Sequence, residues 1–191
     1  MEINAERVIE LVKSVRPLFM DHERASRITV KGAADFVTQV DFLVQERMRS
    51  GLFDMYPQVQ FMGEEKDNRD IDFSGAVWIL DPVDGTTNLI HDFRCSALSL
   101  ALCDRGQMEL GIIYQPYEDE LFLAQRGKGA FLNGNPIHVS SVKDLGQSLI
   151  SIGTSPYNHD LADRNFEDIK RVFLKCSDIR RTGSAAVDLA Y

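Results

Sequence analysis

The stretch from Trp78 to Asn88 constrains this chain more than any other. It joins an apolar run directly to the sequence Asp81-Pro82-Val83-Asp84-Gly85-Thr86-Thr87. An apolar strand thus delivers two aspartates, three residues apart, to a position where a helix can begin. Carboxylate oxygens suit Mg²⁺, and N–H groups at a helix start after a glycine suit phosphate. The stretch therefore predicts one point at which a divalent cation and a phosphate could be held together.

Each part of this stretch also has an ordinary structural explanation. Asp-Pro and Asp-Gly are common turn dipeptides, and Thr86 and Thr87 are most often simple helix caps. A metal site becomes the better interpretation because a second acidic pair, Glu64-Glu65, follows Gly63 at the end of another apolar run. Converging carboxylates without basic partners repel one another, and a cation relieves that repulsion. The carbonyl of Val83 is a plausible further ligand.

For two residues outside the motif, the sequence alone leaves open whether their role is functional or structural. Asp41 could stand behind a Thr86 hydroxyl that orients an attacking water, but a charge at a helix start explains it more simply. Lys31 is by itself best explained as a surface lysine.

Composition excludes several classes of protein. The 191 residues suffice for one domain with a buried core, and the net charge of -8 with no basic stripe argues against nucleic-acid or anionic-membrane partners. Cys95, Cys103 and Cys176 are odd in number and lack zinc-site spacing, so we expect buried free thiols in a reducing compartment. No signal peptide or membrane-length apolar run is visible, and the expected location is the cytoplasm.

Apolar periodicity predicts alternating helices and strands within a single domain, 1–191. A first helix is expected near residues 3–22, with a kink or early end at Pro17. A second helix follows a capping box formed by Thr38 and Asp41 and ends at Pro57. Asn133-Gly134 predicts a hairpin turn in an antiparallel meander. The expected strands are 27–31, 59–62, 76–80, 95–103, 108–114, 121–124, 130–132, 149–152 and 178–180, with a polar loop at 66–75 and helices at 161–175 and from 183 onwards.

The chain stops at Tyr191 inside the last predicted helix. Domains seldom finish in an apolar helix such as Ala185–Ala190, because its buried face would lack cover. The expectation is that the chain is a fragment or that a partner supplies the rest.

Several ordered motifs together resemble the inositol monophosphatase family of Mg²⁺-dependent, lithium-sensitive phosphatases. The resemblance spans nearly the whole chain. The motifs are Asp81–Asn88, Gly63-Glu64-Glu65, Lys31–Asp41, Gly127–Gly134 and Arg181–Ala186. The fold that this resemblance implies is a layered α-β-α-β-α sandwich of the inositol monophosphatase and fructose-1,6-bisphosphatase type, with its last layer incomplete, and often a homodimer.

The resemblance also implies roles for individual residues. Glu64, Asp81 and the Val83 carbonyl would hold a first ion, Asp81 and Asp84 a second, and Glu65 a nearby water, for two or three Mg²⁺ ions in all. Thr86 and Asp41, with Glu64, would activate the attacking water. The remaining roles are phosphate binding at Asp84, Gly85 and Thr86, contact with the substrate alcohol at Gly183, Ser184 and Ala185, and closure of a mobile loop at Lys31.

The implied reaction is hydrolysis of a small phosphate ester, inositol 1-phosphate first, by a metal-activated water and with inhibition by Li⁺. Fructose 1,6-bisphosphate and 3′-phosphoadenosine-type nucleotides are alternatives, although the short loop from Lys66 to Gly75 favours a monophosphatase. The family's second motif, a Trp-Asp that adds a metal ligand, is absent from the chain. A catalytically impaired fragment that acts as a binding module is therefore a further alternative.

Overall fold

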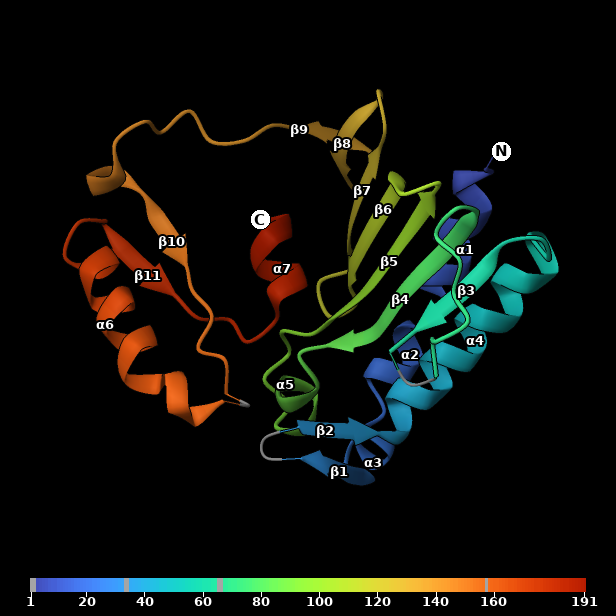
Figure 1. Ribbon diagram of the computed structural model, residues 1–191, viewed down its shortest axis with the longest axis horizontal. Helices are drawn as coiled ribbons and strands as arrows, with labels where there is room; N and C mark the ends of the chain where they lie inside the picture. The colour runs from blue at the N-terminus through green and yellow to red at the C-terminus, as the bar shows by residue number, and fades with distance from the viewer. Residues whose placement is uncertain (1–2, 33–34, 65–66, 157) are drawn as a thin grey trace.

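The computed structural model describes residues 3–32, 35–64, 67–156 and 158–191. Figure 1 shows its elements as successive layers of helix, sheet, helix, sheet and helix from right to left, which confirms the expected sandwich. The helical layers are formed by α1 (Ala5–Lys13) with α4 (Gln39–Met55), by α7 (Ala185–Ala190), and by α6 (Ala162–Phe173).

The first sheet is mixed and has seven strands in the order β3-β4-β5-β6-β7-β8-β9. Strand β3 runs parallel to β4, and every later neighbour is antiparallel, so the predicted meander is confirmed. The strands are β3 (Gln60–Gly63), β4 (Ala76–Asp84), β5 (Ala97–Asp104), β6 (Gln107–Gln115), β7 (Glu120–Gln125), β8 (Gly129–Leu132) and β9 (Asn135–Ile137).

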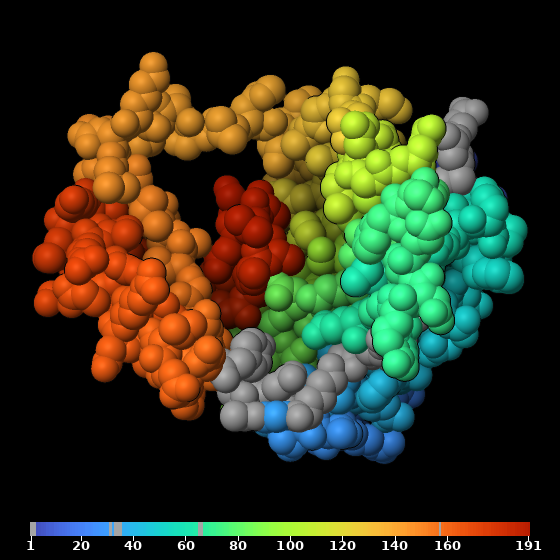
Figure 2. Space-filling view, viewed as in Figure 1, coloured from blue at the N-terminus to red at the C-terminus, as the bar shows by residue number. Residues whose placement is uncertain are grey.

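The second sheet is small and lies on the far side of α7. Strands β10 (Leu149–Ser151) and β11 (Asp178–Arg180) pair in parallel, and α6 connects them. Short 3₁₀ turns, η1 (Leu145–Gln147) and η2 (His159–Leu161), flank β10. The chain between β9 and β10 crosses over α7, and Figure 2 shows an opening beside that helix.

The N-terminal helix is interrupted near Pro17, as predicted, but it is divided further than expected. The single helix expected near 3–22 is three helices, α1, α2 (Arg16–Phe19) and α3 (His22–Ala25). Pro17 is the cause, because proline is tolerated only in the first turn of a helix, and it lies in the first turn of α2. The next strand, β1 (Ile28–Gly32), pairs antiparallel with β2 (Asp35–Thr38), a strand that the sequence pattern did not predict.

Helix α4 begins at the predicted capping box. Asp41 accepts a hydrogen bond from the N–H of Thr38, and the Thr38 side chain accepts from the backbone of the first turn. The helix ends at Met55, two residues before Pro57, as predicted. Its capping box fixes where the Asp41 side chain lies, which matters for the site below.

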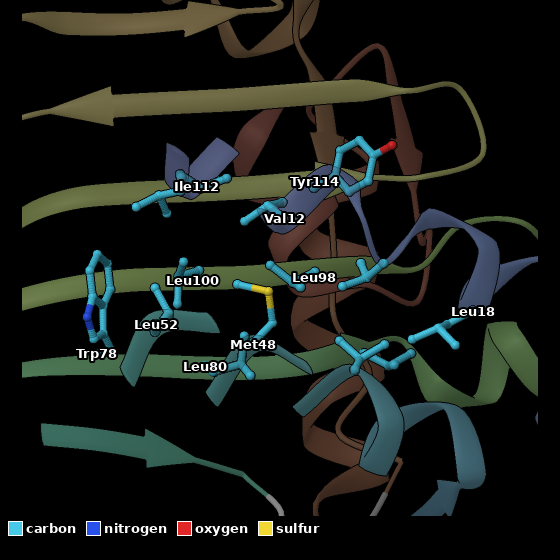
Figure 3. Close-up of a cluster of buried hydrophobic side chains, with 14 of the residues drawn as sticks. Val12, Leu18, Met48, Leu52, Trp78, Leu80, Leu98, Leu100, Ile112 and Tyr114 are labelled. Carbon is cyan, nitrogen blue, oxygen red and sulfur yellow. The ribbon is translucent and has the colours of Figure 1, made fainter. Parts of the chain in front are cut away.

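The main core lies between α1, α4 and the seven-stranded sheet. Figure 3 shows side chains from both helices meeting alternate residues of β4, β5 and β6. Burial of this apolar surface supplies most of the stability of the layer, at roughly 25 cal/mol per Å². The labelled members are Val12, Leu18, Met48, Leu52, Trp78, Leu80, Leu98, Leu100, Ile112 and Tyr114.

The structure also bears on the cysteines and on membrane insertion. All three cysteines are free, but Cys103 alone is fully buried, whereas Cys95 and Cys176 are half-buried, contrary to the expectation for those two.

In the described parts of the chain, none of the helices combines the length and the apolar character that crossing a membrane requires.

Candidate active site

Strand β4 carries both aspartates of the central motif on the strand itself. The sequence predicts a strand that ends at Leu80, whereas β4 continues to Asp84. Its pairing with β5 is regular as far as Asp81 and then shifts register before Asp84. Such an irregularity bends a strand and redirects its side chains. Asp81 and Asp84 consequently line one pocket at the end of the strand.

Gly85 joins β4 to the short helix α5 (Thr86–Ile90). Its φ of 91° lies in the left-handed region, which glycine adopts without strain. A Cβ here would be 3.2 Å from the carbonyl oxygen of Cys95 and 3.3 Å from that of Gly183. Any other residue would therefore have to push these two backbone segments away by a few tenths of an ångström, in addition to adopting a strained φ. The first N–H groups of a helix lack intrahelical partners, and the start of α5 lines the pocket.

The pocket has a volume of about 200 Å³. It lies where the end of β4, the start of α5 and the chain leading into α7 come together (Figure 1). Its polar lining is mainly acidic, and Arg181 is the one cationic side chain that the described residues contribute to it. The lining residues are Phe36, Glu64, Asp81, Val83, Asp84, Gly85, Thr86, Thr87, Pro156, Arg181 and Gly183.

The acidic side chains of the pocket interact unfavourably with one another. Burial, followed by the negative charges of Glu64 and Asp84, raises the pKa of Asp81 to about 8. The N–H of Val83 donates to Asp81 Oδ1 at 3.1 Å and opposes this shift only in part. Within the described residues, no three acidic, histidine or cysteine side chains already converge as a closed ligand set. The all-oxygen donors and the mutual repulsion nevertheless fit a hard divalent cation.

Asp41 reaches the pocket from α4. Its Oδ2 accepts from the Thr38 N–H at 2.8 Å and from the Thr38 hydroxyl at 2.6 Å, whereas its Oδ1 lies 3.2 Å from Thr86 Oγ1. The Thr86 hydroxyl also lies 3.0 Å from the Val83 carbonyl oxygen, so its single proton has two acceptors. Asp41 is 2% exposed, and burial raises its pKa despite these hydrogen bonds.

Asp84 is held from the opposite side by the chain that enters α7. Ser184 Oγ donates to Asp84 Oδ2 at 2.5 Å, and the N–H of Ala186 donates to the same oxygen at 2.6 Å. Asn88 connects the same segments, because its Nδ2 donates to the carbonyl oxygens of Cys95 at 2.6 Å and Thr182 at 2.8 Å. Residues about one hundred positions apart are thereby fixed against the end of β4.

The structure thus brings most of the predicted site residues together. Glu64, Asp81, Val83, Asp84, Gly85, Thr86 and Gly183 line the one pocket, and Asp41 contacts it through Thr86. Ser184 and Ala185 line an adjoining pocket of about 480 Å³ that also contains Asp84.

Two predicted site residues are not tested by the structure. Glu65 lies outside the described residues, and so does the side chain of Lys31, although its backbone belongs to β1. Sequence reasoning missed Arg181 as a lining residue. Its only signal was its place within the Arg181–Ala186 motif.

Comparisons with known proteins identify the family of the chain. A family model described as the inositol monophosphatase family matches residues 1–191. A protein named inositol monophosphatase from Dictyostelium discoideum is 35% identical, over 97% of this chain and 70% of that protein. A protein named Nus factor SuhB from Vibrio cholerae is 40% identical, over 88% of this chain and 64% of that protein.

A solved structure shows the same fold. The extragenic suppressor protein suhB from Bartonella henselae superposes with a TM-score of 0.88 and 31% identity, over 98% of this chain and 73% of that chain. The chain spans 70% and 64% of the lengths of the two curated relatives above. Because the family model matches residues 1–191 and the Dictyostelium relative is 35% identical over 97% of the chain, the chain belongs to the inositol monophosphatase family.

Proposed function

We propose that this pocket hydrolyses a phosphate monoester with the help of Mg²⁺. One observation carries the proposal: the Thr86 hydroxyl lies 3.2 Å from the buried carboxylate of Asp41, at the edge of a pocket that gathers Glu64, Asp81 and Asp84. A hydroxyl backed by a buried carboxylate is suited to accepting a proton from a water molecule. The family supports a phosphatase, and the substrate and the role of each residue are our assignment.

The residues that would hold the cations are Glu64, Asp81, Asp84 and the carbonyl oxygen of Val83. Mg²⁺ commonly binds through one or two carboxylates and keeps further positions for water and phosphate oxygens, so this donor set is sufficient. Glu65 is a further candidate on its sequence position. When bound, divalent cations would neutralise the phosphate and lower the pKa of a water molecule.

Thr86 and Asp41 orient that water and take its proton. Both hydrogen bonds from Thr38 go to Asp41 Oδ2, which leaves Oδ1 directed at Thr86. The proton passes from water to the Thr86 oxygen as the Thr86 proton moves to Asp41. The raised pKa of Asp41 favours this transfer, because the buried carboxyl is better able to keep the proton.

The start of α5 binds the phosphate in this proposal. The N–H groups of Thr86 and Thr87 stand at the first positions of the helix, where a backbone N–H has no intrahelical partner, and the positive end of the helix favours an anion. The alcohol part of the substrate lies towards the adjoining pocket, beside Gly183 and Ala185.

We assign inositol 1-phosphate as the first substrate, because the Dictyostelium relative carries the name inositol monophosphatase. The net charge of -8 supports a small phosphate ester over nucleic acid as the ligand. Inhibition by Li⁺ and a homodimer are part of the same proposal. A fructose-1,6-bisphosphatase or a 3′-phosphoadenosine nucleotidase of the same superfamily remains the alternative reaction, and assaying the three substrates side by side separates them.

A binding module is a second candidate function. It is favoured by the Vibrio relative, whose name is a Nus factor rather than a phosphatase. Metal titration with simultaneous phosphate assay distinguishes the two candidates. A binding module would give a Mg²⁺ binding event without phosphate release, whereas an enzyme gives both.

Substitution of Thr86 tests the proton path directly. Thr86→Val keeps the shape of the side chain but removes the hydroxyl, so we expect phosphate release from inositol 1-phosphate to fall by about 10²–10⁴-fold. Thr86→Ser keeps the hydroxyl and should retain most of the rate. A Thr86→Val variant that is folded, as judged by circular dichroism, and as fast as the wild type would contradict the assignment.

A further inference from the structure

The two oxygens of Asp84 have different environments. Oδ2 accepts both the Ser184 hydroxyl at 2.5 Å and the Ala186 N–H at 2.6 Å. With the residues that the structure describes, Oδ1 forms no hydrogen bond, while Asp84 itself lines the acidic pocket. One oxygen is therefore anchored to the fold, and the other is left for the pocket.

The single proton of the Ser184 hydroxyl is used within the protein. Ser184 is 0% exposed, and it caps α7 by accepting from the Val187 N–H at 3.2 Å while it donates to Asp84. A hydroxyl has one proton to donate. That proton is committed to the carboxylate, so the Ser184 side chain has none left for a substrate alcohol.

We infer that Ser184 is a positioning residue for the cation site. By fixing Oδ2, its hydroxyl holds the Asp84 carboxylate in one orientation, in which Oδ1 can bind a divalent cation. A carboxylate that is already oriented loses less side-chain freedom when the cation binds. This inference rests on the proposed function, since it concerns the same cation site, and it assigns to Ser184 a role other than contact with the substrate.

A purely structural role makes a different prediction. If Ser184 only capped α7, its loss would weaken folding and leave the affinity of the folded protein for a cation unchanged. Cation affinity, measured on folded protein, is the readout that separates the two roles.

The first experiment measures Mn²⁺ affinity by electron paramagnetic resonance of the free ion. We expect Ser184→Ala to bind Mn²⁺ about tenfold more weakly than the wild type, and Ser184→Thr, which keeps the hydroxyl, to restore affinity to within about threefold. Asn4→Ala is the matched control, because the Asn4 side chain also caps a helix, by accepting from the Arg7 N–H at 3.1 Å, but does not line the acidic pocket. Its affinity should equal that of the wild type.

The second experiment needs no metal. A double-mutant cycle of Ser184→Ala and Asp84→Ala, in EDTA, measures the Ser184–Asp84 interaction as the coupling between their effects on the unfolding equilibrium. The Ser184→Ala substitution removes the α7 cap both in the presence and in the absence of the Asp84 side chain, so the effect of the lost cap cancels in the coupling. A charge-assisted hydrogen bond predicts a coupling of at least about tenfold in the equilibrium constant.

The outcomes separate this inference from the proposed function. Absence of coupling overturns the inference whatever the metal does. Coupling with equal Mn²⁺ affinities for wild type and Ser184→Ala also overturns it, while leaving the cation site in place. Coupling in a wild-type protein that binds no Mn²⁺ overturns both, because the hydrogen bond would then be structural alone.

Discussion

In two aspartates of the site, one carboxylate oxygen forms hydrogen bonds that hold the fold, and the other is directed at the pocket. Asp41 Oδ2 accepts hydrogen bonds from Thr38 in the capping box, and Asp41 Oδ1 lies next to the Thr86 hydroxyl. Asp84 gives Oδ2 to Ser184 and Ala186 and leaves Oδ1 unbound by the described residues. The hydrogen bonds to the two Oδ2 atoms thus fix the orientation of the two Oδ1 atoms, to which we assign proton transfer in Asp41 and cation binding in Asp84.

The pKa of Asp81 gives a residue-scale prediction about pH. A carboxyl with a folded pKa near 8 and an unfolded value near 3.8 stabilises the fold below the unfolded value, and this contribution is lost as the pH rises towards 8. In EDTA, the wild type should therefore lose stability relative to Asp81→Asn between pH 5 and pH 8.5. Urea denaturation of both proteins at both pH values measures the difference.

Addition of Mg²⁺ provides the companion measurement. A bound cation offsets the repulsion between ionised carboxylates, so Mg²⁺ should stabilise the wild type more at pH 8.5 than at pH 5. A stability difference between wild type and Asp81→Asn that stays constant with pH would contradict our account of the pocket.

At the scale of elements, the junction of β4 with α5 depends on Gly85. Gly85→Ala should cost about 1–2 kcal/mol for the left-handed φ alone, and its Cβ would also press on two carbonyl oxygens at 3.2 and 3.3 Å. We expect loss of both stability and phosphate release, measured by urea denaturation and by activity per folded molecule.

Gly106 offers the matched control. Its φ is 75°, and a Cβ there would meet nothing within 4 Å. Gly106→Ala should lose stability through φ strain without a change in activity. Equal activities for the two variants would show that the close approach at Gly85 does not support the site.

Elements with strong local signals could be predicted from the sequence. The capping box of Thr38 and Asp41 and the meander with its Asn133-Gly134 turn are encoded within a few residues, and both are present. The division of the first helix at Pro17 was predicted only as a kink or early end, because α2 and α3 each extend for a single turn.

Contacts between segments that are distant in the sequence could not be predicted from local sequence patterns. Thr86 meets Asp41 across 45 positions and Ser184 meets Asp84 across 100, and no periodicity encodes such pairs. The family resemblance supplied the first pair, whereas the second became visible only in the structure. The extension of β4 to Asp84 was missed because Pro82 resembles a strand terminator, although it lies where the ladder shifts register.

At the scale of the whole molecule, segments from different layers form the pocket and its surroundings. Asp81 and Asp84 come from the end of β4, Arg181 and Gly183 from the chain between β11 and α7, and Asp41 of α4 contacts the pocket through Thr86. A pocket assembled in this way requires the layers to be folded against one another. The family relationship covers these layers together, since the match extends over residues 1–191.

The initial rate of phosphate release from inositol 1-phosphate, measured against Mg²⁺ concentration for wild type and Asp84→Asn, tests the central claim most directly. Our account predicts saturable, Mg²⁺-dependent release by the wild type that EDTA abolishes. It also predicts no release by a folded Asp84→Asn variant. Release that is independent of Mg²⁺, or that survives in Asp84→Asn, would contradict the assignment of this pocket as a metal-dependent phosphatase site.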